Sequence, residues 1–283
     1  RDLRMSRGLG DVYKRQIEYC IWIIYRPKRN VILYFPLPKY KEWYMAILII
    51  FRKEVYSMSI ERMVYTGTTY FGEYARKEII TEIKKRKYNK ALVVTDAMLV
   101  QCGVAEKIEN VLKDGGISYE IDDEVKPNPT IDNVHTGLDK LKASGADFII
   151  AVGGGSVIDT AKAVAVIANN PDNYDVVSLE GVDKSKNPPM PIIAVPTTAG
   201  TGSETTMDYV ITNTEQKRKM ACMDSMVVPV VAILDTDIMA SLPLKMTAAT
   251  AMDALTHAVE SYLSKGAFDF SEMLSLKAVS LIS

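Results

Sequence analysis

The feature of this sequence that most constrains its fold is a regular alternation of short apolar runs with helix-forming segments. Buried strands are predicted at residues 90–95 (KALVVT), 117–121 (ISYEI), 146–152 (ADFIIAV), 191–196 (PIIAVP) and 230–234 (VVAIL). Helices are predicted between the first three strands, over residues 103–113 and from the candidate N-cap Thr130 to about residue 143. Strands that alternate with helices in this way predict a mostly parallel sheet with helices on both faces.

The pattern changes after Pro243. Residues 248–282 carry apolar side chains at three- and four-residue spacing, which predicts helix, and no further strand is predicted. We therefore expect a fold of the α/β class, in which a parallel-sheet domain over residues 58–243 is followed by the first helices of an all-α domain over residues 244–283.

Residues 1–57 differ from the rest of the chain in charge. They contain 12 Lys/Arg and 5 Asp/Glu, whereas the whole chain of 283 residues has a net charge of −1. Their apolar runs, residues 17–25 and 44–51, are shorter than the roughly 20 residues that span a bilayer. One interpretation is a membrane-surface anchor. We favour a non-native leader, because MSRGLGDVYKRQ resembles translated adapter sequence and Met58 offers a start, and we expect no membrane partner.

Charge and cysteine content exclude other classes. A net charge near zero argues against a general nucleic-acid binder, which needs a basic surface. The three cysteines, Cys20, Cys102 and Cys222, are far apart and form no CxxC pair, so neither a disulfide framework nor a cysteine-rich zinc module is expected. We therefore expect a reducing compartment, the cytoplasm.

A glycine-rich loop is the first functional signal. Gly153, Gly154, Gly155 and Ser156 follow a predicted strand and open a predicted helix. Backbone N–H groups in such a loop can approach an anion closely, and the helix N-terminus adds a partial positive charge, so the loop is a candidate phosphate cradle. It is not a Walker A loop, and Ile158 stands where G-x-G-x-x-G requires its third glycine. A tight turn without a ligand is the alternative.

Two further polar groups end strands of the same predicted sheet. Asp96 could accept hydrogen bonds from ribose hydroxyls, which would favour NAD over NADP, or it could simply be the N-cap of the next helix. Thr197, Thr198 and Thr201 supply hydroxyls after another strand, although a plain polar loop would look the same. Parallel sheets bind ligands at the carboxyl ends of their strands, so all of these groups are expected at one edge.

A candidate metal site lies in the helical part. Asp253 and His257 are four residues apart, so on a helix both side chains project from one face and could share a divalent ion. A surface hydrogen-bonded pair is the alternative, and two ligands alone leave a catalytic site incomplete. His135, the other histidine, is expected on a solvated helix face.

Three segments together resemble the iron-containing (group III) alcohol dehydrogenases: GADFIIAVGGGSVIDTAKA, PIIAVPTTAGTGSE and MDALTHAVESYL, in this order and at these intervals. The likeness extends over residues 58–283. The resemblance implies an N-terminal α/β domain that binds a nicotinamide dinucleotide and an all-helical C-terminal domain that holds Fe²⁺ in the cleft between them. It also implies a homodimer in the full-length protein.

The resemblance assigns cofactor contacts to matching residues along residues 96–219. These are Asp96 at the adenosine ribose, Asn128 beside the cofactor, Gly154, Gly155 and Ser156 in the pyrophosphate cradle with Asp159 behind them, Thr197, Thr198 and Thr201 near the pyrophosphate and nicotinamide, and Lys219 along the cofactor.

For the metal, the resemblance assigns Asp253 and His257 as the first two ligands. The other two ligands of the family are histidines in a region that would follow Ser283. The expected function is hydride transfer between NAD(H) and a short-chain alcohol or aldehyde, such as 1,2-propanediol or lactaldehyde, while Fe²⁺ polarises the substrate oxygen. With two of four ligands, the 283-residue chain is expected to be inactive by itself, and no catalytic side chain is assigned.

Two alternatives remain open. One is a zinc-dependent relative on the same fold, similar to glycerol dehydrogenase, with Zn²⁺ in place of Fe²⁺. The other belongs to a different functional class, a non-catalytic nucleotide-binding module, which would bind NAD without turnover.

Overall fold

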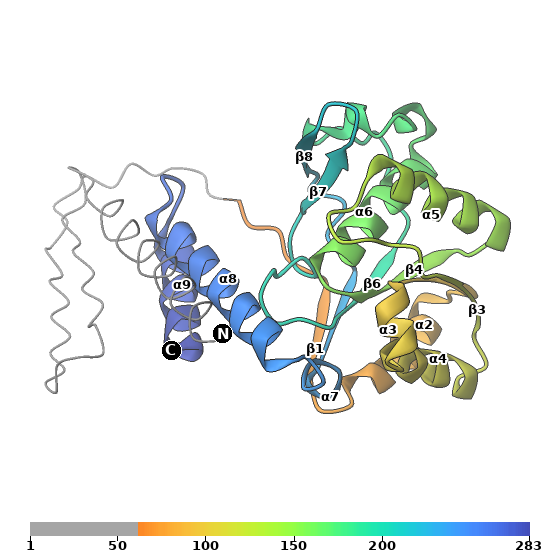
Figure 1. Cartoon of the computed structure of the whole chain (residues 1–283), viewed down its shortest axis with the longest axis horizontal. Helices are drawn as coiled ribbons and strands as arrows, with labels where there is room; N and C mark the ends of the chain where they lie inside the picture. The colour runs from red at the N-terminus through yellow and green to blue at the C-terminus, as the bar shows by residue number, and fades with distance from the viewer. Residues whose placement is uncertain (1–61) are drawn as a thin grey trace, which may run out of the picture. The chain divides into compact units, whose positions relative to one another are not determined.

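The computed structural model describes residues 62–283 (Figure 1). The segment interpreted as a non-native leader, residues 1–57, lies outside the described residues. Within them, the elements follow in the order β1 (Thr68–Gly72), α2 (Glu78–Arg86), β2 (Lys90–Val94), α3 (Ala97–Gln101), α4 (Val104–Asp114), β3 (Ser118–Asp122), α5 (Ile131–Ser144), β4 (Phe148–Gly153), α6 (Gly155–Asn169), β5 (Gly181–Val182), β6 (Ile192–Pro196), β7 (Asp208–Asn213), β8 (Arg218–Met223), β9 (Val231–Asp235), α7 (Thr236–Met239), α8 (Leu244–Leu263) and α9 (Asp269–Ile282).

The predicted parallel sheet is confirmed. Six strands pair in the order β1-β9-β6-β4-β2-β3, and every pairing is parallel. All residues of β4 and β6 are buried, which explains why these strands have continuous apolar sequences rather than alternating ones. The predicted α/β class is therefore correct, and the carboxyl ends of the strands share one edge.

Helices cover both faces of this sheet. Leu92 and Ile149 belong to a core cluster with residues of α5 and α6, whereas their neighbours Val93 and Ile150 pack with residues of α2 and α4. This division follows from the strand period of two, which turns successive side chains to opposite faces. Figure 1 shows α5 and α6 on one side of the sheet and α2 and α4 on the other.

A second, smaller sheet was not predicted. It has the order β5-β8-β7, and β7 and β8 form an antiparallel hairpin in which Thr212 is opposite Lys219. Met220 and Cys222 of β8 are buried while Lys219 and Ala221 are exposed, so the signal was an alternation of period two.

The helical part after Pro243 consists of two helices, α8 and α9, that pack against each other. The predicted helical character of residues 248–282 and the prediction of more than one helix are correct, but no break was placed at residues 264–268, where α8 ends at its C-cap Ser264. Each helix buries a single residue, Ala258 in α8 and Ser275 in α9. Within residues 62–283, no helix has the length and apolar character needed to cross a bilayer.

Candidate cofactor and metal site

The glycine loop joins β4 to α6 and so lies at the carboxyl edge of the parallel sheet. Gly154 is the N-cap of α6, in an extended conformation and without a side-chain cap. The first N–H groups of a helix have no partner within the helix, so they remain available to an anion. The structure thus has the strand, turn and uncapped 15-residue helix that a phosphate cradle requires.

The hydroxyl-bearing loop after β6 packs against this cradle. Gly153 is paired with Pro196 in the sheet, and the Thr197 N–H donates to the Gly153 carbonyl at 3.1 Å. A Cβ built on Gly154 would lie 3.4 Å from Thr198 Oγ1. The structure therefore brings Thr197 and Thr198 beside the glycine loop, as predicted from the strand ends.

A side chain at Gly155 would fill the space between the two loops. Its Cβ would lie 3.2 Å from Thr201 Cγ2 and 3.3 Å from Ser203 Oγ. These contacts are tighter than ordinary van der Waals distances, so glycine permits the loops to approach. The arrangement fits a pyrophosphate held between backbone N–H groups and hydroxyls, and Ser156 in the first turn of α6 is at the same place.

Asp96 occupies the end of the neighbouring strand β2. It is the N-cap of α3, and its Oδ1 accepts a hydrogen bond of 2.9 Å from the Leu99 N–H. The N-cap role, one of the two alternatives predicted for Asp96, is therefore correct, and the N-cap hydrogen bond uses only the Oδ1 oxygen. The side chain is half-buried at the sheet edge that carries the cradle, and a ribose contact stays a prediction.

Asn128 and Lys219 lie on either side of the hairpin strand β7. The Thr212 hydroxyl donates to the Asn128 carbonyl at 3.4 Å, and the Thr212 N–H donates to the Pro129 carbonyl at 2.7 Å. Lys219 is opposite Thr212 on β8 and is exposed. Both predicted residues are thus near Thr212, and the hairpin missed in the sequence is what presents Lys219.

Asp159 lies one turn into α6, facing the start of β7. Its Oδ2 accepts a hydrogen bond of 3.0 Å from the Val210 N–H. Its Oδ1 is buried and accepts no hydrogen bond of normal geometry from the part of the chain that the structure describes. Burial raises the pKa of Asp159 to about 6, against the lowering effects of the Val210 N–H and the Lys162 ammonium.

Lys162 is a buried cation that sequence reasoning missed. Its side chain is fully buried, and Nζ donates to the carbonyls of Thr206 and Asp208 at 2.7 and 2.8 Å and to Thr206 Oγ1 at 3.2 Å. Burial lowers the pKa of Lys162 to about 8, partly opposed by Asp159 and Asp208. The spacing of Asp159 and Lys162, three residues apart on a predicted helix, was the available signal.

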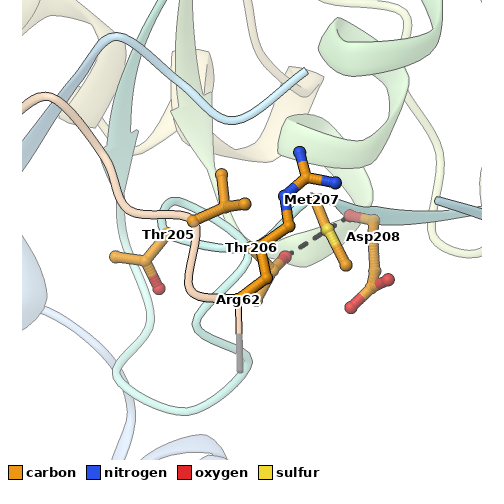
Figure 2. Close-up of a pocket in the computed structure, with 6 residues that line it drawn as sticks. Arg62, Thr205, Thr206, Met207 and Asp208 are labelled. Carbon is orange, nitrogen blue, oxygen red and sulfur yellow. Dashed lines mark hydrogen bonds between the residues drawn. The ribbon is translucent and has the colours of Figure 1, made fainter. Parts of the chain in front are cut away.

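A pocket of about 390 Å³ lies beside these contacts, and its lining residues are drawn in Figure 2. It is lined by Arg62, Val64, Thr205, Thr206, Met207 and Asp208. None of the predicted site residues lines it, so this pocket is separate from the predicted cofactor contacts.

The two candidate metal ligands are on α8. Asp253 Oδ2 and His257 Nε2 are 3.6 Å apart, and both side chains are about half exposed, at 47% and 59%. A carboxylate and an imidazole on one helix face are suitable donors for a divalent ion. No group of three or more such donors occurs among residues 62–283, so the described part holds two ligands of a site at most.

Comparison with known proteins identifies the family. The model described as iron-containing alcohol dehydrogenase matches residues 66–236, and the model described as the C-terminal part of the Fe-containing alcohol dehydrogenase family matches residues 247–283. The chain belongs to the iron-containing alcohol dehydrogenase family. The resemblance stated from the three sequence segments is confirmed.

Individual relatives agree with this family. Lactaldehyde reductase from Escherichia coli (strain K12) is 47% identical over 222 residues, which cover 78% of this chain and 58% of that protein. The crystal structure of a 1,3-propanediol oxidoreductase matches with a TM-score of 0.75 at 38% identity, covering 78% of this chain and 58% of that one. Sulfoacetaldehyde reductase from Bifidobacterium kashiwanohense, solved in complex with NAD⁺, matches with a TM-score of 0.73 at 31% identity, covering 79% and 59%. The chain spans less than two thirds of the length of these iron-containing alcohol dehydrogenase relatives.

Proposed function

We propose that the protein to which this chain belongs is an NAD-dependent oxidoreductase of short-chain alcohols and aldehydes, such as 1,2-propanediol and lactaldehyde. Its α/β part, residues 58–243, would bind the cofactor, and residues 244–283 would begin the metal-binding part. The observation that carries the proposal is the packing of the Thr197–Thr201 hydroxyl loop against the uncapped glycine start of α6.

In this proposal the N–H groups of Gly155 and Ser156 and the hydroxyls of Thr198 and Thr201 bind the pyrophosphate. The opposite charges of the helix N-terminus and the pyrophosphate favour this position. Asp96 would accept from the adenosine ribose, and its negative charge would repel the extra phosphate of NADP. The remaining proposed contacts are those of Asn128, Thr197 and Lys219, with Asp159 supporting the cradle from α6.

Asp253 and His257 would hold Fe²⁺, with Zn²⁺ as the alternative metal. When bound, such a metal polarises the substrate oxygen as a Lewis acid. Because no other donor among residues 62–283 joins these two in a group that could hold a metal, we propose that the 283-residue chain by itself binds the cofactor without turnover. We further propose a cytoplasmic homodimer for the full-length enzyme. The described cysteines, Cys102 and Cys222, are both free, which is consistent with a reducing compartment.

The test uses calorimetric titration of the 283-residue chain with NAD⁺. Replacing Gly155 with alanine should weaken binding at least about tenfold, because the new Cβ narrows the gap that the pyrophosphate would occupy. The matched control is Gly266→Ala, where the nearest atom is 3.9 Å away and the backbone needs no glycine conformation. Equal affinities for wild type and Gly155→Ala, with unchanged circular dichroism, would contradict the proposed cradle.

A non-catalytic nucleotide-binding module is the second candidate, favoured by the lack of a third metal donor among residues 62–283. It is distinguished by NADH formation from 1,2-propanediol in the full-length protein loaded with Fe²⁺. Turnover that is lost in Asp253→Ala supports the oxidoreductase. Absence of turnover, together with NAD⁺ binding that Asp253→Ala leaves unchanged, supports the module.

A further inference from the structure

The segment that follows β3 lies beside Asp96, the residue proposed to contact the adenosine ribose. Val94 pairs with Asp122 in the sheet, and the Thr95 N–H donates to the Asp122 carbonyl at 2.8 Å. Two residues later, Glu124 forms an isolated antiparallel bridge with Asp96. The backbone of Glu124 is therefore directly beside that of Asp96.

The main chain at Glu124 is well anchored. Its N–H donates to Asp122 Oδ1 at 3.3 Å, and its carbonyl accepts from Asn133 Nδ2 on α5 at 3.2 Å. Because both backbone groups are held, the position from which the Glu124 side chain extends is fixed next to Asp96. The side chain itself is 59% exposed and so can be met by a ligand from solvent.

A lysine from α5 is neutralised at this strand end. Lys140 Nζ lies 2.9 Å from Asp122 Oδ1 and 2.9 Å from Glu124 Oε1. The Asp122 carboxylate is buried, so it pairs with Lys140 out of reach of a ligand in solvent. The exposed Glu124 carboxylate covers the lysine on the solvent side. Without Glu124, two of the three ammonium donors of Lys140 would be free for another anion.

We propose that Glu124 is a second determinant of cofactor choice, which excludes a 2′-phosphate from the ribose at Asp96 both by its own charge and by occupying Lys140. The inference rests on the proposed function, in which Asp96 contacts the adenosine ribose. A 2′-phosphate extending past Asp96 would meet a second carboxylate and a cation that is already paired. Ribose hydroxyls carry no charge, so the ribose of an unphosphorylated dinucleotide is not repelled by these carboxylates.

Lys126 is the other basic residue acting on Glu124. Together with Lys140 it lowers the pKa of the Glu124 carboxyl, so the group is negatively charged throughout the neutral range. Lys126 is exposed and leaves the Glu124–Lys140 contact intact. The charge at this strand end therefore depends on the presence of Glu124 and does not change with pH in the neutral range.

The experiment titrates the 283-residue chain with ADP-ribose and with 2′-phospho-ADP-ribose by calorimetry at low ionic strength. These probes carry the adenosine half of the cofactor and need neither nicotinamide nor metal. Glu124→Gln should bind the 2′-phosphorylated probe about tenfold more tightly, because a repulsive charge is removed and a lysine is released. Its affinity for ADP-ribose should stay within about twofold of wild type.

A double variant, Glu124→Gln with Lys140→Gln, should lose most of the gain, which a general loosening of the loop would not do. Asp172→Asn is the matched control, because Asp172 also pairs with a lysine on the surface, Lys186 at 3.0 Å, but follows the far end of α6. It should leave both affinities unchanged.

If wild type binds ADP-ribose, and Glu124→Gln has the same affinity for 2′-phospho-ADP-ribose as wild type, the inference is overturned while the proposed function stands. That outcome would reduce the Glu124–Lys140 contact to an ordinary surface ion pair. Failure of wild type to bind ADP-ribose would instead overturn the proposed cofactor site, and the role of Glu124 with it.

Discussion

Replacing Asp159 with asparagine should stabilise the protein at neutral pH and leave its stability at acidic pH nearly unchanged. Burial raises the pKa of this carboxyl from 3.8 to about 6. Each pKa unit corresponds to about 1.4 kcal/mol, so ionisation of Asp159 is about 3 kcal/mol less favourable in the folded state than in the unfolded chain. Asparagine removes the charge and keeps an oxygen that can accept from the Val210 N–H.

The direction with pH follows from proton binding. Between about pH 4 and pH 6 the folded carboxyl holds a proton that the unfolded carboxyl has released. The contribution of Asp159 to stability is therefore fully present below pH 3.8 and is lost as the pH rises through about 6. Asp159→Asn does not titrate, so its advantage over wild type should grow from less than about 1 kcal/mol near pH 4 to between 2 and 3 kcal/mol, roughly, near pH 8.

Urea unfolding followed by circular dichroism, at several pH values across this range, measures the difference. The pKa of about 6 already includes the attraction between Asp159 and Lys162, so this attraction does not reduce the expected gain further. Asp172→Asn, at an exposed carboxylate, serves as the control and should show no such trend. The reasoning is refuted if Asp159→Asn is less stable than wild type by the same amount at every pH. In that case the contacts of the carboxylate would outweigh its burial.

Two other predictions concern the same sheet edge. Lys162→Met should lower the free energy of unfolding by about 3 to 5 kcal/mol, because the carbonyls of Thr206 and Asp208 lose the charged donor that reaches them from the buried side of α6. Urea unfolding measures the loss, and a change below about 1 kcal/mol would contradict the role of the ammonium. Asp96→Asn should keep the N-cap bond and the melting temperature while raising affinity for 2′-phospho-ADP-ribose relative to ADP-ribose, whereas Asp96→Gly should also lose a few tenths of a kcal/mol of stability. An unchanged preference in both Asp96 variants, read by calorimetry, would remove Asp96 from cofactor selection.

The parallel sheet was predictable because its central strands are buried on both faces. A run such as residues 148–153 has no polar residue to mark a solvent side, and it stands between helical segments, so local pattern and global fold agree. The turn at Gly154 was predictable for the same reason, since a strand and a helix flank it directly.

The hairpin of β7 and β8 was missed because its signal is weaker. Each strand has six residues and alternates exposed with buried positions, so its apolar residues, such as Met220 in β8, form no continuous run. The break at residues 264–268 was missed because apolar spacing continues on both sides of Ser264, so periodicity alone does not reveal the change of direction.

The burial of Lys162 could not be predicted locally. Its acceptors, the carbonyls of Thr206 and Asp208, are more than forty residues away in the sequence, just before and at the first residue of β7, a strand that was not predicted. Asp96 was found in the sequence, but its role could not be decided there, because an aspartate at this position suits both an N-cap and a ribose contact. The structure shows the N-cap hydrogen bond, which needs no ligand, and does not test the ribose contact.

Helix α6 connects the predicted contacts to one another. Its first residues form the cradle, and one turn later Asp159 and Lys162 hold the start of β7 through three backbone groups, the Val210 N–H and the carbonyls of Thr206 and Asp208. The hairpin that presents Lys219 is thus fixed to the same rigid helix as the glycine loop. A charged pair is an expensive way to make this connection, since an apolar pair of similar volume avoids the desolvation of both groups. What a charged pair adds is a fixed register between helix and hairpin. Replacing both Asp159 and Lys162 with apolar residues should therefore preserve the fold but shift the position of Lys219 relative to the glycine loop.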